Sequence, residues 1–381
     1  MLSNYSQIYQ DYFDRWKQDA PRDKIGDPAH FDLDSETQDF FHCFQRLAIR
    51  KYKGEIQYSY WTNNKKTPSL RPTLALNLIR TADAAWTFPS LPDFDWIRIY
   101  TGDVPPRLCA IKESPEYTLI PACLDLSQLS PDCRHLDGYR RQAAYSATRD
   151  NGFEDCNLFL NKDFGLCPDF TFWAYGGAYL PTSDGVSGWV NFYRQAKRYS
   201  PPSNVKAQMV WRGSGRPKSE FAAQLKNPDW SLAMNAPRPY LRDFSSKYPE
   251  ILDAKLVNID GAETRLSPFE MADNYKYILE GGGGGFSARV KWMLFLKRLC
   301  FIREKAWPAF YEINLKPYIH YIPIKQDFSD LLDKYQWAED NPDKCQEIID
   351  NCFKFAETFL SPRSLNKRWH DIINYIVENY Q

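Results

Sequence analysis

The sequence predicts an α/β fold with mostly parallel sheets, divided into two domains. Short apolar strands alternate with helical segments along the chain, which is the pattern of sheets covered by helices. A chain of 381 residues exceeds one ordinary core, so two domains are expected. The clearest unit is a strand at 275–279, followed by five glycines at 281–285 and a helix from residue 287.

The first 200 residues contain alternating strand and helix signals. Apolar runs bounded by turn residues predict strands, at 56–60, 96–100, 117–120 and 156–160. Longer segments with helical periodicity predict helices, at 37–50, 72–83 and 187–199. Ser-Pro-Pro-Ser at 200–203 then forms a stiff turn, because proline fixes its backbone angle and cannot continue a helix. We therefore expect a first domain over residues 1–200.

The rest of the chain continues this alternation. Strands are predicted at 205–211, 256–259, 275–279, 299–302 and 318–322. Helices are predicted at 287–298, 328–338, 342–359 and 364–378. A second domain is expected over residues 201–363, followed by a C-terminal helix within 364–381.

Composition and charge argue against several classes of protein. Basic and acidic residues are equal at 48 each, so a general nucleic-acid or membrane-surface binder is not expected. The most apolar run, 290–302, has 13 residues and includes Lys291, Lys297 and Arg298, so no transmembrane segment is expected. The nine cysteines include no CxxC pair, and the N-terminus has no signal-peptide pattern. A cytoplasmic protein without a metal site is expected.

Two segments carry basic residues and no acidic ones, which indicates a small anionic ligand. One lies between Asp184 and Glu220, and the other, with the glycine run, between Glu280 and Glu304. Backbone N–H groups of glycines and of a helix start can approach a phosphate, and Arg289 adds a fork of donors. The run matches neither a Walker A loop nor a strict dinucleotide fingerprint. Two ordinary solvated helix faces remain the alternative.

Other motifs follow predicted strands or lie in turns. The turn at 212–214 offers a second approach for an anion, or is an ordinary surface turn. Asp103 follows the strand at 96–100 and is either a rigid general base or a common β-turn aspartate. The aromatic segment 171–177 is either a sugar platform or a packed loop. His320 is more typical of a satisfied core histidine than of a catalytic one.

In this order and spacing, the motifs resemble glycosyltransferase family 90, the group that contains protein O-glucosyltransferases and proteins similar to a capsule xylosyltransferase or to lipopolysaccharide-modifying enzymes. The resemblance extends from about residue 97 to residue 359 and rests on 171–177, 211–214, 275–289 and 315–327. Its most specific part is His-Tyr-Ile-Pro at 320–323 with Lys325 and Asp327.

The resemblance implies a GT-B architecture, in which two Rossmann-like domains face each other across a cleft and the C-terminal helix packs back on the first. It implies inverting, metal-independent transfer of xylose or glucose from a UDP-sugar to a glycan hydroxyl, with Asp103 as general base and no cofactor. The residues expected to contact the donor are Arg212, Gly213, Ser214, Arg216, Lys218, Gly284, Gly285, Phe286, Ser287, Ala288 and Arg289. Those expected on the acceptor side are Phe172, Trp173, Gly176, Gly177 and Tyr179.

Two alternatives stay open. A non-catalytic protein that binds a nucleotide sugar or a glycan would keep the same fold. A protein O-glucosyltransferase or O-xylosyltransferase would use a Ser hydroxyl as acceptor. A nicotinamide oxidoreductase is disfavoured, because residues 300–303, about 20 positions after the glycine run, include no acid to bind a ribose.

Overall fold

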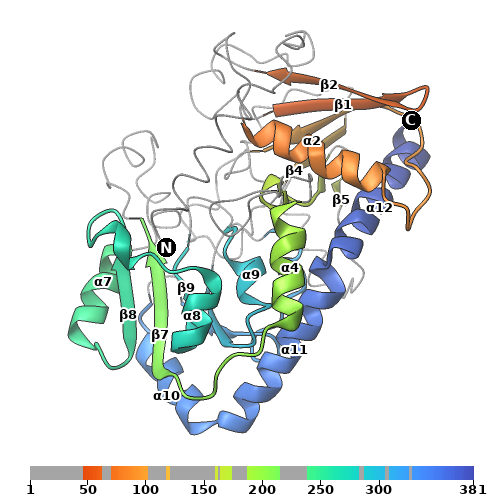
Figure 1. Ribbon diagram of the computed structural model, residues 1–381. Helices are drawn as coiled ribbons and strands as arrows, with labels where there is room; N and C mark the ends of the chain where they lie inside the picture. Colours follow the sequence, from red (N-terminus) through yellow and green to blue (C-terminus); the bar gives the residue numbers. More distant parts are fainter. Residues whose placement is uncertain are drawn as a thin grey trace.

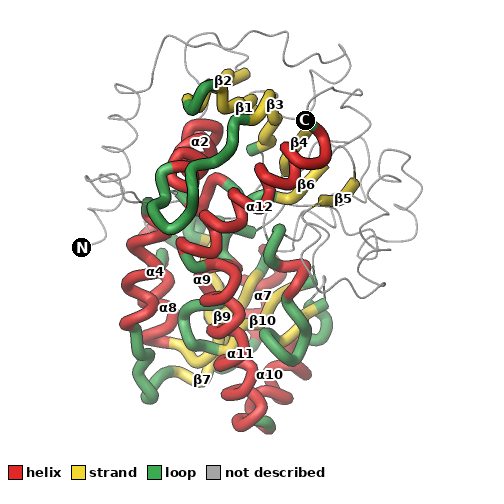
Figure 2. The backbone as a smooth tube through the Cα atoms, turned by 90° about the vertical axis from the view of Figure 1, so that its right-hand side faces the viewer, coloured by secondary structure: helices red, strands yellow, loops and turns green. Residues whose placement is uncertain are grey.

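The computed structural model describes residues 46–61, 70–101, 117–120, 159–161, 164–173, 187–214, 238–282, 287–304, 309–325 and 328–381. These residues form an α/β structure with two β-sheets. Figure 1 shows the sheets in separate parts of the molecule, with the last two helices running along one side from one sheet toward the other. In Figure 2 the strands of the two sheets again form separate groups, with helices between them.

The second sheet is parallel and has a reversal in its strand order. Its strands are β7 (Lys206–Gly213), β8 (Leu252–Leu256), β9 (Tyr275–Glu280), β10 (Leu299–Arg303) and β11 (Ile322–Ile324). The order is β11-β10-β9-β7-β8, and every pair is parallel. The first strand therefore lies between β8 and β9, as in doubly wound nucleotide-binding sheets.

Helices cover both faces of this sheet, because its strands are apolar on both sides. Ile278 of β9 packs into one core, and its neighbours Tyr277 and Leu279 pack into another. The helices contributing to the first core include α4 (Gly188–Arg198), α8 (Pro268–Asn274) and α9 (Val290–Met293). The second core includes residues of α7 (Arg238–Lys247) and α10 (Leu331–Asp340).

The first sheet is mixed, so the expectation of mostly parallel strands is wrong there. Its strands are β1 (Arg46–Tyr52), β2 (Glu55–Trp61), β3 (Phe94–Tyr100), β4 (Tyr117–Ile120), β5 (Phe159–Asn161) and β6 (Phe164–Leu166). The order is β2-β1-β3-β4-β6-β5, with antiparallel pairs β1–β2, β1–β3 and β5–β6. Lys53 and Gly54 both have positive φ, so they form the two-residue turn that closes an antiparallel hairpin.

Several expected elements have different types or bounds. The expected helix at 37–50 is wrong for residues 46–50, which belong to β1, because a strand buried on both faces has the continuous apolar run of a buried helix. The strand expected at 256–259 ends at Leu256, and Ile259 is 59% exposed in the following turn. The strand expected at 318–322 starts only at Ile322, since Tyr318 has a left-handed backbone. The helix α8, which the sequence analysis missed, begins with a capping box of Ser267 and Glu270.

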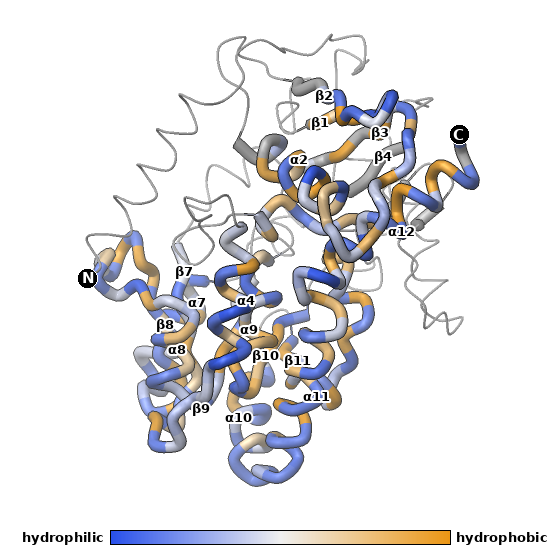
Figure 3. Tube along the Cα trace, turned by 45° about the vertical axis from the view of Figure 1, so that its right-hand side comes forward, coloured by the Kyte–Doolittle hydropathy of each residue, from blue (hydrophilic) through white to orange (hydrophobic). Residues whose placement is uncertain are grey.

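The C-terminal helix packs against the first domain, as expected. After α11 (Pro342–Leu360), the chain turns at Ser361 and continues as α12 (Pro362–Tyr380). Near its middle α12 contacts α2 (Leu70–Asp83), where a ring nitrogen of His370 lies 3.0 Å from the carbonyl oxygen of Ala82. Hydrophobic and hydrophilic residues alternate along α12 in Figure 3, as an amphipathic helix requires. Among the described helices, none is both long and apolar enough to cross a membrane.

Candidate active site

The candidate site lies where β7 and β9 end side by side. Val210 of β7 is opposite Ile278 of β9, so the two strands reach their carboxyl ends together. This is the point at which the strand order reverses, and open α/β sheets bind ligands outside the carboxyl ends of the strands there. Gly213 and Ser214 leave one strand, and Gly281 and Gly282 leave the other. Two of the predicted anion-binding turns are therefore neighbours.

Both turns pack on the buried indole of Trp211, which explains why they are glycine at the contact points. A Cβ on Gly281 would collide with Nε1 of Trp211 and lie 2.8 Å from Cδ1 of Leu241. A Cβ on Gly213 would lie 2.6 Å from Cη2 of the same indole. Glycine therefore lets both backbones lie close to the ring, which brings their polar groups together at the sheet edge.

Two arginines flank Trp211 at this edge. Cζ of Arg289 lies 5.5 Å from the centre of the indole ring, and Cζ of Arg238 lies 5.8 Å from it. Arg238 bridges the turns, donating from Nη1 to the carbonyl oxygen of Ser214 at 2.6 Å and from Nη2 to that of Gly282 at 2.7 Å. Arg289 donates to the carbonyl oxygen of Arg212. The site is therefore positively charged, and the hydrogen bonds of Arg238 join its two turns.

Glu280 connects the glycine turn to Arg289. Its carboxylate is buried, accepts a hydrogen bond from N–H of Gly282 at 2.6 Å, and lies 3.9 Å from Nε of Arg289. Gly282 has a φ of 86°, which favours glycine at this position. The carboxylate therefore holds the turn and orients the guanidinium group at the same time.

The helix after the glycine run is much shorter than expected. Only the four residues Val290–Met293 are helical, and Arg289 is the N-cap. Ser287 is buried, and its Oγ accepts a hydrogen bond from N–H of Arg289 at 3.4 Å. Because a four-residue helix has a small dipole, the positive charge that an anion would meet here comes mainly from the Arg289 and Arg238 side chains.

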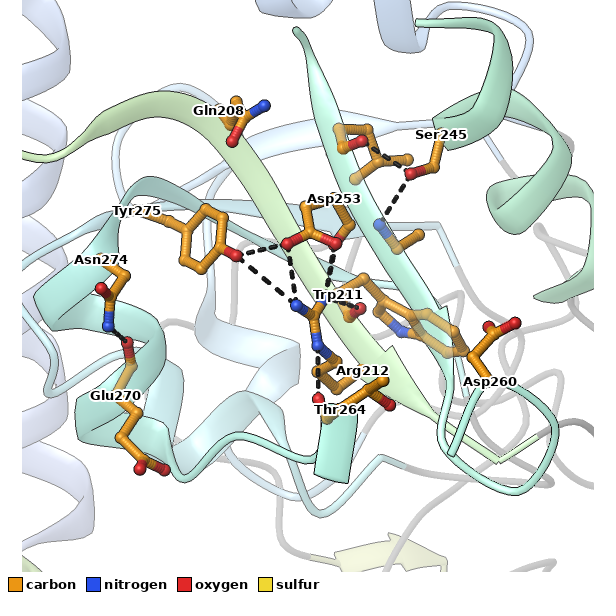
Figure 4. A network of polar contacts seen from close by, with 12 residues as sticks. Gln208, Trp211, Arg212, Ser245, Asp253, Asp260, Thr264, Glu270, Asn274 and Tyr275 are labelled. Carbon is orange, nitrogen blue, oxygen red and sulfur yellow. Dashed lines mark hydrogen bonds and ion pairs between the residues drawn. The ribbon is translucent and has the colours of Figure 1, made fainter. Parts of the chain in front are cut away.

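The Arg212 side chain is occupied by the sheet rather than by the turns. Figure 4 shows its guanidinium facing Asp253 of β8 and Tyr275 of β9. Nη2 lies 2.8 Å from Oδ2 of Asp253, and Nε donates to the carbonyl oxygen of Thr264 at 2.7 Å. The Arg212 side chain thus has a structural role, and the Arg212 carbonyl oxygen accepts the hydrogen bond from Arg289. Its expected contact with the UDP-sugar stays a prediction.

Replacing Arg212 by alanine should reduce the free energy of unfolding by about 2–3 kcal/mol, because Asp253, whose side chain is 22% exposed, would lose its cation. Burial alone would raise the pKa of Asp253, but hydrogen bonds from Arg212 and Tyr275 lower it below its ordinary 3.8. The stabilisation is therefore complete above pH 3.8 and is lost as the pH falls below it. Urea unfolding at pH 7 and at lower pH measures both effects.

Arg242→Ala is the matched control, since Arg242 pairs with Asp260 but is 45% exposed. Its removal should cost less than about 1 kcal/mol. Equal losses for the two alanine variants would contradict the structural role of Arg212.

The aromatic residues predicted on the acceptor side have different surroundings. Phe172 is fully buried, with its ring centre 5.1 Å from that of Trp189, so its ring is part of the core and is not exposed as a platform. Trp173 is half-buried and lines a surface cavity of about 550 Å³ together with Trp86, Arg80 and Arg363. This cavity lies between α2 and the start of α12.

Other predicted residues lie in turns or outside the described part of the chain. His320 is in a turn, where its Nδ1 accepts a hydrogen bond from N–H of Lys316 at 2.9 Å, as a satisfied structural histidine does. The predicted residues outside the described ranges are Asp103, Gly176, Gly177, Tyr179, Arg216, Lys218, Gly284, Gly285 and Phe286. Within those ranges, no three His, Cys, Asp or Glu side chains form a group that could hold a metal ion.

Arg238, Glu280 and Lys291 are charged residues at or near the site that sequence reasoning did not single out for a role. A basic residue at the start of a helix carries no signal of its own, so Arg238 becomes conspicuous only through its two carbonyl partners. Lys291 was counted among the basic residues of the apolar run, but it is fully buried. Its partners are distant in sequence, and no local pattern reveals them.

The chain belongs to glycosyl transferase family 90, because a model of that family matches residues 166–377. The matched part contains the reversal point of the second sheet, Arg289 and the HYIP segment. The α/β structure with its two sheets and returning C-terminal helix agrees with the GT-B fold expected for the family.

Similar proteins include viral and animal sequences. Uncharacterized protein 179R of Invertebrate iridescent virus 6 is 35% identical over 119 residues, which are 29% of this chain and 10% of the viral protein. Protein O-glucosyltransferase 1 of Homo sapiens is 25% identical over 220 residues, covering 55% of this chain and 52% of the human protein. The chain thus spans about half the length of that enzyme, and less of the viral protein. Among solved structures, the GtfA/B complex matches 69% of this chain and 54% of its own, with 10% identity and a TM-score of 0.33.

Proposed function

We propose that this glycosyltransferase moves a sugar from a UDP-sugar to an acceptor hydroxyl, with the diphosphate bound at the reversal point of the second sheet. The observation that carries the proposal is the position of Arg289 beside two glycine turns at the carboxyl ends of β7 and β9. A guanidinium group and closely approaching backbone N–H groups are the donors that suit a diphosphate. Membership of family 90 supports the sugar-transfer chemistry.

The proposed reaction is a single displacement at the anomeric carbon. Asp103 takes the proton of the acceptor hydroxyl, and the resulting oxygen nucleophile attacks the anomeric carbon from the face opposite the leaving group. The bond between that carbon and the phosphate oxygen breaks, and UDP leaves with its electron pair, so the configuration is inverted. Arg289 and the N–H groups of 284–288 meet the developing negative charge, and the reaction needs no metal ion.

Glucose and xylose are the proposed donor sugars, and a glycan hydroxyl is the proposed acceptor. A Ser hydroxyl of a protein is the second candidate acceptor, favoured by the names of the protein O-glucosyltransferases among the relatives. The two sugars differ by one hydroxymethyl group, so the preference between them depends on the volume of the pocket and on whether a protein group hydrogen-bonds the extra hydroxyl.

The test measures UDP release from UDP-glucose and from UDP-xylose, with and without EDTA, alongside UDP binding by calorimetry. We expect UDP to bind and to be released from at least one donor at the same rate in EDTA. Binding without release, even when glycan and Ser-containing peptide acceptors are supplied, would indicate a non-catalytic binding protein. Absence of UDP binding would contradict the proposed function itself, and loss of activity in EDTA would contradict metal independence.

A further inference from the structure

A buried ion pair lies directly behind the candidate site. The side chains of Lys291 and Asp169 are 0% and 1% exposed, and Nζ lies 3.4 Å from Oδ1. Lys291 also donates to the hydroxyl oxygen of Thr171, and its Nζ lies 3.7 Å from the ring centre of Phe172. Asp169 in turn accepts a hydrogen bond from N–H of Thr171 at 2.8 Å. Both charges are thus held in a defined geometry.

The pair joins segments that belong to different sheets. Lys291 is in α9, two residues after Arg289 and within the connection from β9 to β10. Asp169 is the N-cap of the short helix η6 (Phe170–Phe172), which follows β6 of the first sheet. Through this contact, the segment that carries Arg289 is attached to the first domain.

The segment that carries Arg289 needs such an attachment. Helix α9 has four residues, and its N-cap makes no side-chain hydrogen bond. A single helical turn is unstable in isolation, because few hydrogen bonds compensate for the fixed backbone angles. Arg289 itself is 21% exposed, so packing alone holds its side chain less firmly than that of Lys291. Besides the buried apolar side chains of residues 290–296, the buried ammonium group is an additional anchor for this turn.

Stability alone is a weak reason to retain a buried ion pair, since apolar side chains of the same volume often stabilise a fold equally well. Burial lowers the pKa of Lys291 to about 8, while Asp169 acts to raise it, so the ammonium group is charged at neutral pH. The pair instead fixes how the two segments lie relative to each other, because a buried charge restricts its partners to one arrangement.

We propose that Lys291 is a positioning residue, whose ion pair with Asp169 holds Arg289 in the geometry that binds the UDP diphosphate. The proposal rests on the proposed function, since it concerns the same donor site. Lys291 touches no substrate in this scheme, and it acts through the turn that it shares with Arg289.

The first domain provides a matched control pair. Lys51 of β1 is 3% exposed, and its Nζ lies 2.6 Å from Oδ1 of Asp83 at the end of α2. Lys51 is also buried and its partner is distant in sequence, although Asp83 is 19% exposed. The hydrogen bonds of Lys51 go to Asp83, Ser90 and Leu91, and none of them goes to β7 or β9. Its neutralisation should affect stability without affecting the donor site.

The experiment compares Lys291→Met/Asp169→Asn with Lys51→Met/Asp83→Asn. Both double variants avoid leaving one buried charge unpaired. We expect the midpoint temperature of thermal unfolding to be lowered similarly in each. The dissociation constant of UDP and the KM for the UDP-sugar should rise about tenfold in the Lys291 variant only, while kcat at saturating donor is retained. Thr171→Val keeps the charges and removes the hydroxyl that accepts a hydrogen bond from Lys291 and donates one to Asp169. It should raise both constants about threefold.

The possible outcomes separate the two proposals. Wild-type UDP affinity in the Lys291 variant, or equal losses of affinity in both double variants, would overturn the positioning role. If the Lys291 double variant does not fold, unchanged UDP affinity in Thr171→Val would overturn it. If the wild-type protein does not bind UDP, the proposed function itself fails.

Discussion

Replacing Arg289 by alanine should weaken UDP binding about 30- to 100-fold, which corresponds to about 2–3 kcal/mol. The guanidinium group lies beside Trp211 at the two glycine turns, and the short helix behind it contributes little dipole. Arg289→Lys should bind UDP with intermediate affinity, since lysine keeps the charge but loses the bidentate fork. Titration calorimetry measures the dissociation constant of UDP for the wild-type protein, Arg289→Ala and Arg289→Lys.

Arg298→Ala is the matched control for Arg289. Arg298 belongs to the same basic segment and is also partly buried, donating to the carbonyl oxygens of Ala272 at 2.9 Å and Pro202 at 2.7 Å. It immediately precedes β10, so it lies at the amino edge of the sheet, opposite the candidate site. Its removal should cost stability and leave UDP affinity unchanged. Wild-type UDP affinity in Arg289→Ala would remove the main support for the proposed donor site.

Replacing Asp103 by asparagine should lower sugar transfer about 10²- to 10⁴-fold, because asparagine cannot take the proton from the acceptor hydroxyl. UDP affinity should stay unchanged, since the proposed role of Asp103 concerns the acceptor hydroxyl and not the diphosphate. Asp103 itself lies outside the described residues, but it follows β3, which lies between β1 and β4 in the first sheet. Rates of sugar transfer and UDP binding, measured on the same preparation, test both statements.

Asp95→Asn controls for the loss of a carboxylate near the same strand. Asp95 is an exposed residue of β3, and its Oδ1 accepts a hydrogen bond from N–H of Trp96 at 2.8 Å. Its replacement should leave the rate of transfer unchanged. Full transfer activity in Asp103→Asn would exclude this residue as the base, while the donor site would remain testable through Arg289.

Sequence patterns predicted the second sheet better than the first, for a physical reason. The strands of a parallel sheet are buried on both faces, so β7, β9 and β10 each appear as an apolar run bounded by turns. The same property misled the interpretation of β1, where Leu47, Ala48 and Ile49 are all buried and resemble a helix segment. The helix expected after the glycines was too long for a related reason, since apolar residues there are buried in turns as well as in α9.

The sequence by itself determined the α/β class, the strand–glycine–helix unit with Arg289, and the resemblance to family 90 that the family match confirmed. These features depend on local spacing, because periodicity and turn residues encode burial and chain reversal within a few positions. Only the tertiary structure decided which charged groups meet. Arg212 pairs with Asp253 across 41 positions of the sequence, and Lys291 pairs with Asp169 across 122 positions. Arg238 joins two turns that are also distant in sequence. Such contacts depend on how the sheets and helices pack, so no local pattern in the chain reveals them.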